Sequence, residues 1–320
     1  MNILITSVGS RNKIVQYFKK ELGKSGKVIV TDMSNLAPAI YDADKFYLVP
    51  KIDSPNYIDK LLEICKKEKI DCLFALIDPE LSLISKNAEK FIKIGTTPLI
   101  SSYESVELAF DKYKMFKYLE SNGFKTAKTY IDKSTFYKDL GNNEISFPVF
   151  VKPIKGSASI NISKVNTKEE IELLFSLYND LIIQEFMDGE EIGADVYIDP
   201  ISQKVVSIFT KEKIKMRAGE TDKSRSFKDE KLFQLIKQVV EKIGYVYMID
   251  MDIFKINGEY YISEINPRFG GGYPHAYESG VNFPKLIVNS MNGVENTVEI
   301  GNYEEEIYMM KYNEVKIIKR

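Results

Sequence analysis

The sequence predicts a protein of mixed class, α/β followed by α+β, with a parallel sheet first and antiparallel sheets after it. Two observations support this prediction. Short apolar strands alternate with amphipathic helical patterns up to about residue 103. In the rest of the chain, strands are joined by hairpin turns such as Asn257-Gly258. The length of 320 residues allows two or three small domains with a well-buried core.

The composition argues against several classes of protein. Lys plus Arg is 44 and Asp plus Glu is 46, so the net charge of −2 gives no support for nucleic-acid binding. No apolar run is long enough to span a bilayer, and MNILITSVGS lacks the basic and apolar regions of a signal peptide. Cys65 and Cys72 are too few for a zinc site or a disulfide framework. We therefore expect a cytoplasmic protein with neither a nucleic acid nor a membrane as partner.

The first domain is expected to span residues 1–103. Its predicted strands are NILIT, KVIVTD, KFYLVP and DCLFALI, with the helical patterns IVQYFKKEL and YIDKLLEICKKEKI among them. Parallel sheets bind ligands at the carboxyl ends of their strands. Those ends carry Ser10, Arg11, Asp32, Asp78 and Glu80. Arg11, Asp78 and Glu80 are therefore candidate substrate residues, although ordinary helix caps and turn residues are an equal alternative.

The rest of the chain predicts a helix followed by paired strands. The helix covers residues 104–122 and ends at Gly123. Strands are predicted at FPVFVKP and LIIQEFM, and GADVYID with KVVSIFT forms a predicted hairpin. VYMIDMDIFKI and EYYISEIN form a second predicted hairpin around Asn257-Gly258. The C-terminal stretch EEIYMMKYNEVKIIKR predicts one or two edge strands.

The register of the second hairpin decides whether its carboxylates converge. A strict two-residue turn would pair Ile256 with Glu259 and Asp252 with Ser263, which puts Glu264 on the opposite face of the sheet. A three-residue loop with a bulge would place Asp252 opposite Glu264, and Asp250 opposite Asn266, on one face. In that register two carboxylates and an amide oxygen converge, and hard oxygen ligands suit Mg²⁺. A solvated acidic sheet face is the alternative.

Two further stretches are typical of nucleotide binding. Lys152 ends an apolar strand and is followed by PIKGSAS, a small loop whose amides could cover phosphates. No P-loop occurs, and a Lys-Pro pair before a Gly/Ser turn is common by itself. QEFMDGEE offers a strand edge for a purine and a carboxylate for ribose hydroxyls. Plain surface charge is the alternative for Glu190 and Glu191.

The second substrate has its own candidates. KEKIKMRAGETDKS, residues 211–224, is polar and basic and predicts a mobile loop. Lys211, Lys213 and Arg217 of this loop could hold an anionic substrate, with a solvated charged loop as the alternative. His275 is the only histidine and follows three glycines. It is a candidate substrate contact, with a structural hydrogen bond as the alternative.

Four motifs, in this order, resemble the ATP-grasp superfamily: DKYKMFKYL, FPVFVKPIKGSAS, IIQEFMDGEEIGADV and DMDIFKINGEYYISEINPR. The resemblance covers roughly residues 105–295. SEINPRFGGGYPHAYESG is most similar to single-copy proteins related to the large chain of carbamoyl-phosphate synthetase. The resemblance implies a preceding α/β domain at 1–103, a small lobe with its linker helix at 104–180, a large lobe at 181–300 and C-terminal edge strands at 301–320.

The resemblance also implies a role for each matching residue. Lys112 and Lys152 match the phosphate-binding positions, where the carbamoyl-phosphate enzymes tend to have Arg in place of Lys112. Arg268 matches the arginine that stabilises the transferred phosphate, and with Lys152 it is the expected catalytic pair. The remaining nucleotide contacts are Ser157 and Ser159 in the phosphate loop, Glu185 and Met187 at the adenine and Glu191 at the ribose. The metal ligands are Asp252, where Glu or Gln is more usual, Glu264 and Asn266.

The implied function is an ATP- and Mg²⁺-dependent (or Mn²⁺-dependent) ligase that forms a C–N bond. A carboxylate attacks the γ-phosphate of ATP, and an amine then displaces phosphate from the acyl phosphate. One alternative is a carbamoyl-phosphate half-reaction with a partner chain, because a complete large chain carries two ATP-grasp halves. The other is a nucleotide-binding regulatory module without turnover. The expected partners are a small carboxylate and an amine, and a homodimer is possible.

Overall fold

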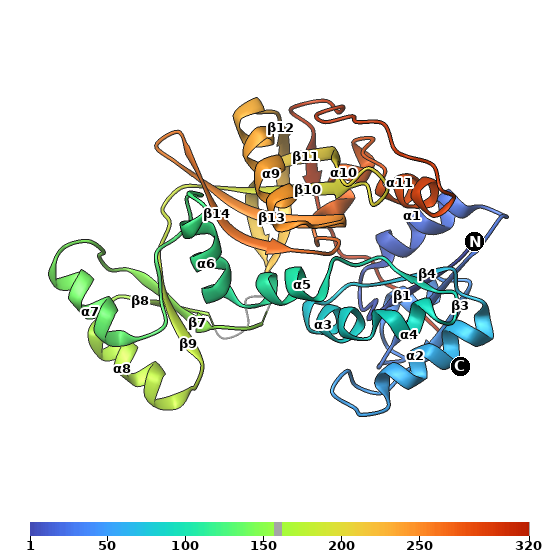
Figure 1. Cartoon of the computed structure of the whole chain (residues 1–320), viewed down its shortest axis with the longest axis horizontal. Helices are drawn as coiled ribbons and strands as arrows, with labels where there is room; N and C mark the ends of the chain where they lie inside the picture. The colour runs from blue at the N-terminus through green and yellow to red at the C-terminus, as the bar shows by residue number, and fades with distance from the viewer. Residues whose placement is uncertain (157–161, 320) are drawn as a thin grey trace.

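The computed structural model describes residues 1–156 and 162–319. It contains a parallel sheet at the N-terminus and two antiparallel sheets after it, as the sequence predicts. Figure 1 shows the N-terminal domain on one side and the smaller antiparallel lobe on the other, with the larger antiparallel lobe between and above them. In the described residues no helix combines the length and the apolar character needed to cross a membrane.

The N-terminal domain is built on a five-stranded parallel sheet of order β3-β2-β1-β4-β5. Its elements are β1 (Asn2–Thr6), α1 (Asn12–Leu22), β2 (Lys27–Asp32), the 3-10 helix η1 (Pro38–Tyr41), β3 (Lys45–Leu48), α2 (Tyr57–Glu68), β4 (Cys72–Ala75), α3 (Asp78–Lys86), α4 (Ala88–Ile92) and β5 (Thr97–Pro98). The central strand β1 is buried on both faces, because Ile3 packs in the cluster of α1 and Leu4 in the cluster of α2. Strands β1 and β4 are adjacent and parallel, so Arg11 and Asp78, which follow them, lie at the same edge.

Two helices, not one, connect this domain to the rest. The predicted single helix over 104–122 is wrong: α5 (Tyr103–Phe110) and α6 (Lys112–Ser121) are separated by Asp111. Asp111 has an extended backbone and forms a β-bridge with Lys155. Its Oδ1 accepts a hydrogen bond from Lys114 N at 3.0 Å, which caps α6. Lys112 is therefore the first residue of a new helix.

The small lobe is a four-stranded antiparallel sheet of order β6-β9-β7-β8 with two helices. Its elements are β6 (Thr129–Tyr130), α7 (Lys133–Gly141), β7 (Val149–Pro153), β8 (Ser163–Val165), α8 (Lys168–Leu177) and β9 (Leu181–Glu185). Strand β9 pairs with β7 along its length. The expected boundary between residues 180 and 181 would therefore divide this sheet, and we place the end of the lobe after Glu185.

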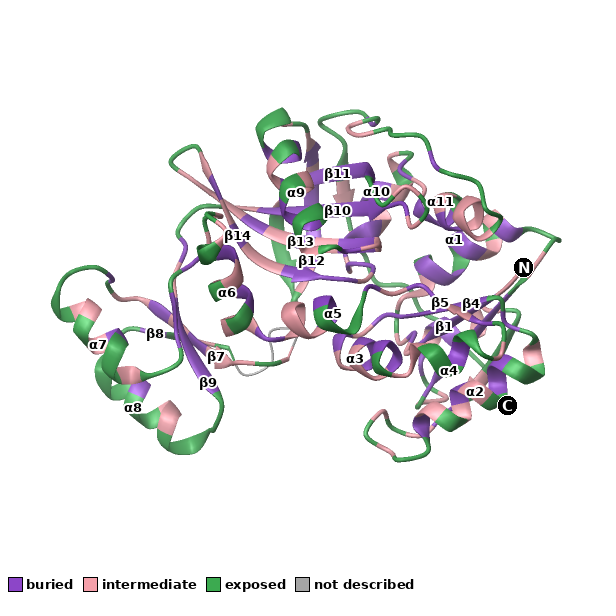
Figure 2. Cartoon of the chain, in the orientation of Figure 1, coloured by how far each residue is buried: buried purple, intermediate pink, exposed green. Residues whose placement is uncertain are grey.

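The large lobe is a six-stranded antiparallel sheet of order β14-β13-β10-β11-β12-β15. Its elements are β10 (Glu190–Ile198), β11 (Val205–Arg217), β12 (Glu220–Phe227), α9 (Glu230–Ile243), β13 (Tyr247–Ile256), β14 (Glu259–Asn266), α10 (Tyr273–Glu278), α11 (Phe283–Met291) and β15 (Tyr308–Met310). Figure 2 shows β10 and β11 largely buried, whereas exposed surface dominates α7 and α8 of the small lobe. Both predicted hairpins and one C-terminal edge strand are confirmed.

The predicted mobile loop at residues 211–224 is wrong. These residues form the hairpin of β11 and β12, with a tight turn at Ala218-Gly219. Lys211 and Lys213 point inward and meet carboxylates of neighbouring strands, so the charge of the stretch does not mark it as a solvated loop. Lys211 and Lys213, two residues apart on β11, share one face of the sheet.

Candidate functional site

The hairpin of β13 and β14 places the predicted metal ligands on one face of the large lobe. Asp252 lies opposite Glu264, and Asp250 lies opposite Asn266. The turn itself is the tight two-residue form, with Ile256 opposite Glu259, so the predicted three-residue loop is wrong. The register changes between Asp252 and Ile253, where a bulge adds one residue to β14. The predicted convergence is thus confirmed, but a bulge inside the strand produces it.

Cations of the small lobe and its linker face these carboxylates. Burial raises the pKa of Glu264, and so does the nearby Asp252, whereas Lys112 and Lys152 act in the opposite direction. Burial lowers the pKa of Lys152 to about 8, helped by Lys112 and opposed by Glu264 and Asp252. The ammonium of Lys112 also donates to the backbone oxygen of Gly156 at 2.5 Å. Charged side chains of the linker, the small lobe and the large lobe therefore lie close to one another.

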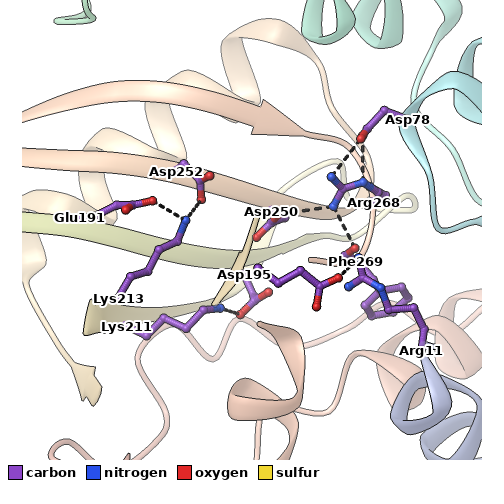
Figure 3. A network of polar contacts seen from close by, with 11 residues as sticks. Arg11, Asp78, Glu191, Asp195, Lys211, Lys213, Asp250, Asp252, Arg268 and Phe269 are labelled. Carbon is purple, nitrogen blue, oxygen red and sulfur yellow. Dashed lines mark hydrogen bonds and ion pairs between the residues drawn. The ribbon is translucent and has the colours of Figure 1, made fainter. Parts of the chain in front are cut away.

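Lys213 lies between two of the predicted nucleotide-site residues. Its ammonium is 2.5 Å from Asp252 Oδ1 and 2.9 Å from Glu191 Oε1, and its side chain is only 4% exposed. Burial alone would lower the pKa of Lys213, but Asp252 and Glu191 raise it above its usual range. Figure 3 shows the lysine reaching up from β11 between the two carboxylates. Its contacts therefore associate Lys213 with the predicted nucleotide residues.

The metal-binding prediction can be tested against the donor atoms. The described residues contain no group of three His, Cys, Asp or Glu side chains arranged to hold a metal ion. Mg²⁺ seldom needs such a cage, because it is commonly held by one or two carboxylates together with waters and substrate phosphates. An ammonium already lies against Asp252, which shows that this carboxylate accepts a cation. The residues thus fit a Mg²⁺ ion bound jointly with a nucleotide.

Arg268 follows β14 and is fixed by residues from both sides of the domain boundary. Its Nε lies 2.8 Å from Asp78 Oδ1, and its Nη2 donates to Asp78 Oδ2 at 3.0 Å. Its Nη1 donates to the backbone oxygen of Phe269 at 3.1 Å and lies 3.5 Å from Asp250 Oδ2. Burial alone would lower the pKa of Arg268, but Asp78 and then Asp250 raise it above its ordinary value. Figure 3 shows the guanidinium between the two carboxylates.

Three glycines after Arg268 let charged side chains pack directly on the backbone. A Cβ at Gly270 would lie 2.3 Å from Asp250 Oδ1, and one at Gly272 would lie 2.8 Å from Lys211 Cε. A Cβ at Gly271 would lie 2.8 Å from Arg11 Nη1. None of the three has a positive φ. Glycine is therefore required here by the close approach of neighbouring side chains and not by the backbone conformation.

Two ion pairs line the same glycine segment. Lys211 is sealed against Asp195, with 1% and 2% of the side chains exposed. Arg11 Nη2 lies 2.8 Å from Glu220 Oε1, and this pair remains accessible. Burial lowers the pKa of Arg11. Arg11, Asp78, Lys211, Lys213 and Arg268 are therefore gathered in one region of the molecule.

Three predicted substrate residues have structural partners instead. Glu80 is fully buried and accepts hydrogen bonds from Ser7 Oγ at 2.6 Å and from the Tyr57 hydroxyl. His275 is buried between the Ser224 hydroxyl, 2.8 Å from Nδ1, and the Ile307 carbonyl, 3.0 Å from Nε2. Arg217 lies at the exposed end of β11 and pairs with Asp222 at 2.9 Å. These contacts favour the structural alternatives for Glu80 and His275.

The remaining predicted nucleotide residues lie where the small lobe joins the large lobe. Glu185 ends β9 and accepts a hydrogen bond from Lys128 N at 3.0 Å. Met187 is 8% exposed and lies between β9 and β10. Ser157 and Ser159 lie outside the described residues.

The sequence predictions missed Asp195, Glu220 and Lys311 as members of this region. Glu220 is held between Arg11 and Lys311, whose ammonium is 2.9 Å from Glu220 Oε2. Asp195 could have been noticed as a lone carboxylate within the apolar strand GADVYI. Nothing local in the sequence marks Glu220 or Lys311, because their partners are distant in the chain.

The comparisons with known proteins identify the family. A family model described as an ATP-grasp domain matches residues 109–272, which is half of the chain. A second model, described as the PylC-like N-terminal domain, matches residues 3–99. The chain belongs to the ATP-grasp family.

Relatives and solved structures support this assignment. The carbamoyl phosphate synthase large chain of Clostridium beijerinckii is 24% identical over 90% of this chain but only 28% of its own length. The chain thus spans about a quarter of such relatives. The D-alanine–D-alanine ligase of Flavobacterium johnsoniae is 30% identical over 41% of this chain and 42% of its own length.

Solved structures share the fold at low sequence identity. The biotin carboxylase domain of Hydrogenobacter thermophilus 2-oxoglutarate carboxylase, in complex with MgADP, ADP and bicarbonate, has a TM-score of 0.78 at 18% identity, covering 96% of this chain and 73% of its own. The N5-carboxyaminoimidazole synthetase of Staphylococcus aureus, complexed with ADP, has a TM-score of 0.73 at 17% identity, covering 92% of this chain and 77% of its own.

Proposed function

We propose that the chain is an ATP- and Mg²⁺-dependent ligase that joins a small carboxylate to an amine. The single observation that carries the proposal is the convergence of Asp252, Glu264 and Asn266 on one sheet face, with Lys152 and Arg268 close by. Relatives named as ligases, including D-alanine–D-alanine ligase and phosphoribosylamine–glycine ligase, agree with this reaction class.

The nucleotide would lie between the two antiparallel lobes. Lys112 and Lys152 would bind its phosphates, together with Ser157 and Ser159 of the proposed phosphate loop. Glu185 and Met187 would contact the adenine at the junction of the lobes, and Glu191 would hold the ribose. Lys213, first expected to bind substrate, is better assigned to the nucleotide because its ammonium contacts Glu191 and Asp252.

Asp252, Glu264 and Asn266 would hold Mg²⁺ (or Mn²⁺). A bound metal would supply positive charge to offset the phosphate charge of the nucleotide. The burial that raises the pKa of Glu264 makes a divalent cation a favourable partner for its carboxylate.

The chain's own residues would act by positioning and by neutralising charge. A carboxylate oxygen of the substrate attacks the γ-phosphorus, and the bond to the leaving ADP oxygen breaks. Arg268 would bind the oxygens of the transferred phosphoryl group, and Lys152 would bind the nucleotide phosphates. The amine nitrogen then attacks the acyl carbon, and the carbon–oxygen bond to phosphate breaks. Arg11, which remains accessible beside the glycine segment, is the proposed contact for the substrates, whereas Lys211 is sealed against Asp195.

A second candidate keeps the same nucleotide chemistry with a different carboxylate. Similarity to the carbamoyl phosphate synthase large chains of Clostridium acetobutylicum and Clostridium beijerinckii extends over 88% and 90% of this chain. This similarity favours a half-reaction on bicarbonate together with a partner chain. A homodimer and a cytoplasmic location remain part of the proposal.

The proposal is tested by phosphorus NMR of the protein with Mg²⁺-ATP and pools of amino acids, small carboxylates, amines and bicarbonate. We expect ADP and phosphate to appear only with particular pools, and Glu264→Gln to lower that turnover at least 100-fold. Glu259→Gln is the matched control, because Glu259 lies on the same strand but pairs with the exposed Lys125 and Lys231.

Three outcomes would contradict the proposal. Formation of AMP and pyrophosphate would show adenylation of the substrate. Equal loss of turnover in Glu264→Gln and Glu259→Gln would show a general effect on the hairpin. Nucleotide binding without turnover in every pool would favour a regulatory module.

A further inference from the structure

Asp78 connects the N-terminal domain to the proposed reaction centre. It is the first residue of α3, and Arg268 follows β14 in the large lobe, 190 positions along the chain. Asp78 also lines a small cavity together with Gly156, Glu264 and Asn266. The carboxylate is therefore close to the predicted metal ligands while belonging to a different domain.

We propose that Asp78 is a positioning residue that fixes the guanidinium of Arg268 for phosphoryl transfer. The inference rests on the proposed function and goes beyond it, because it makes the N-terminal domain part of the reaction centre. Asp78 then contacts neither the carboxylate nor the amine substrate. It acts through Arg268 alone.

The geometry of the pair supports this role. Arg268 Nη2 donates a hydrogen bond to Asp78 Oδ2 at 3.0 Å, and Nε lies 2.8 Å from Asp78 Oδ1 in a close ion-pair contact that lacks the geometry of a hydrogen bond. A hydrogen bond and a second close contact to the same carboxylate restrict both the position and the rotation of the guanidinium. The side chains are 11% and 9% exposed, so water screens the pair only weakly. Arg268 is thus held in one orientation before any nucleotide arrives.

Asp78 is itself held rigidly. It begins a helix in which Glu80, two residues later, is fully buried and hydrogen-bonded to Ser7 and Tyr57. This buried anchor ties the first turn of α3 to Ser7, directly after β1, and to the start of α2. A carboxylate on a fixed helix end is a better orienting group than one on a free loop.

Neighbouring carboxylates cannot replace Asp78. Asp250 lies farther from the guanidinium, at 3.5 Å from Nη1, and contacts it at one point only. Loss of Asp78 would therefore leave Arg268 charged and held through Nη1 alone, by Asp250 and the Phe269 carbonyl. The expected defect is in the geometry of phosphoryl transfer, while the binding of the nucleotide itself should be little changed.

The test compares two ligands by titration calorimetry: MgADP alone, and MgADP with aluminium fluoride, which imitates a phosphoryl group in transfer. The variants are wild type, Asp78→Asn and Glu278→Gln, each checked by thermal unfolding. Asp78→Asn keeps the shape of the side chain and removes its charge. Glu278→Gln is the matched control, because Glu278 accepts a hydrogen bond from Tyr17 at 2.8 Å and so joins the same two domains away from Arg268.

We expect wild type and Glu278→Gln to bind MgADP more tightly when aluminium fluoride is present. For Asp78→Asn, the increase in affinity caused by aluminium fluoride should be at least tenfold smaller than for wild type. Its affinity for MgADP alone should stay within twofold of wild type. Asp78→Glu, which keeps the charge, should recover part of the gain if Asp78→Asn proves unstable.

The inference is overturned if Asp78→Asn keeps the full gain, or if Glu278→Gln loses as much, since domain packing in general would then be responsible. It also falls if wild type binds MgADP but gains nothing from aluminium fluoride. Failure of wild type to bind MgADP at all is a distinct result, because it overturns the proposed function and the inference with it.

Discussion

Buried charges in this molecule are compensated by partners from other strands and domains. Lys211 on β11 is sealed against Asp195 on β10, and Arg268 after β14 is held by Asp78 from the N-terminal domain. Removing one partner of such a pair leaves a buried charge and typically costs about 3–5 kcal/mol. Substitution of these residues must therefore be judged by folding as well as by activity.

The stability of the folded chain should depend on pH through His275. Burial lowers its pKa to about 4, and the nearby Lys211 acts in the same direction. Nε2 donates to the Ile307 carbonyl, so in the neutral ring Nδ1 accepts from Ser224. Below the ordinary histidine pKa of about 6.5 the unfolded chain binds a proton that the folded chain does not. Stability is therefore lost as the pH falls from about 6.5 toward 4, by up to about 1.4 kcal/mol per pH unit.

We expect His275→Gln to flatten this part of the pH profile. Urea unfolding at pH 7, 6 and 5 measures it: wild type should lose about 1–2 kcal/mol more than the variant between pH 7 and 5. Parallel losses in the two proteins would show that other groups cause the acid sensitivity.

At the scale of elements, the break between α5 and α6 is tied to the nucleotide site. Asp111 caps α6 through Lys114 N, and Lys112 begins that helix with its ammonium on Gly156 O. The cap therefore sets the direction from which Lys112 approaches the nucleotide site. Thr167 caps α8 of the small lobe in a similar way, accepting from Glu170 N at 3.3 Å, without a predicted nucleotide residue beside it.

We expect Asp111→Ala and Thr167→Ala to lower the free energy of unfolding by about 1 kcal/mol each, the usual effect of losing an N-cap. Only Asp111→Ala should also weaken the binding of a non-hydrolysable MgATP analogue, by about three- to tenfold. Urea titration and calorimetry on both variants measure the two effects. Equal nucleotide affinity in the two variants would show that the cap of α6 does not influence the nucleotide site.

At the scale of the whole molecule, a nucleotide held between two lobes should stabilise the folded chain. A ligand present at 100 times its Kd adds about 2.7 kcal/mol to the free energy of unfolding, which raises the melting temperature by several degrees. We expect that increase with MgADP and a much smaller one with ADP and EDTA. Differential scanning fluorimetry measures it, and equal increases with and without the metal would argue against a shared metal–nucleotide site.

Local patterns in the sequence predict much of this fold. Alternating strands and helices indicate the N-terminal parallel sheet, and Asn257-Gly258 indicates the last hairpin. The prediction of a single helix over 104–122 fails because Asp111 caps α6 and forms a β-bridge with the distant Lys155, which helical periodicity does not reveal. The lysine-rich stretch at 211–224 fails because its charge is neutralised by Asp195, Glu191 and Asp252, which lie on neighbouring strands.

The candidate site was predictable where neighbours in sequence are neighbours in space. Asp252, Glu264 and Asn266 share one hairpin, and their facing arrangement could be proposed from its register. The contact of Arg268 with Asp78 and that of Arg11 with Glu220 join distant segments, so they depend on how the domains pack. No local pattern specifies such packing.

The extra residue in β14 bears on how relatives should be aligned with this chain. Ser263 is the extra residue of the bulge, because Ile262 pairs with Ile253 and Glu264 pairs with Asp252. A homologue that lacks this one residue would have a regular ladder and the same two acidic partners. A homologue with a one-residue gap at position 263 can therefore keep the complete site. An alignment that does not allow this gap would pair the acidic residues with the wrong positions.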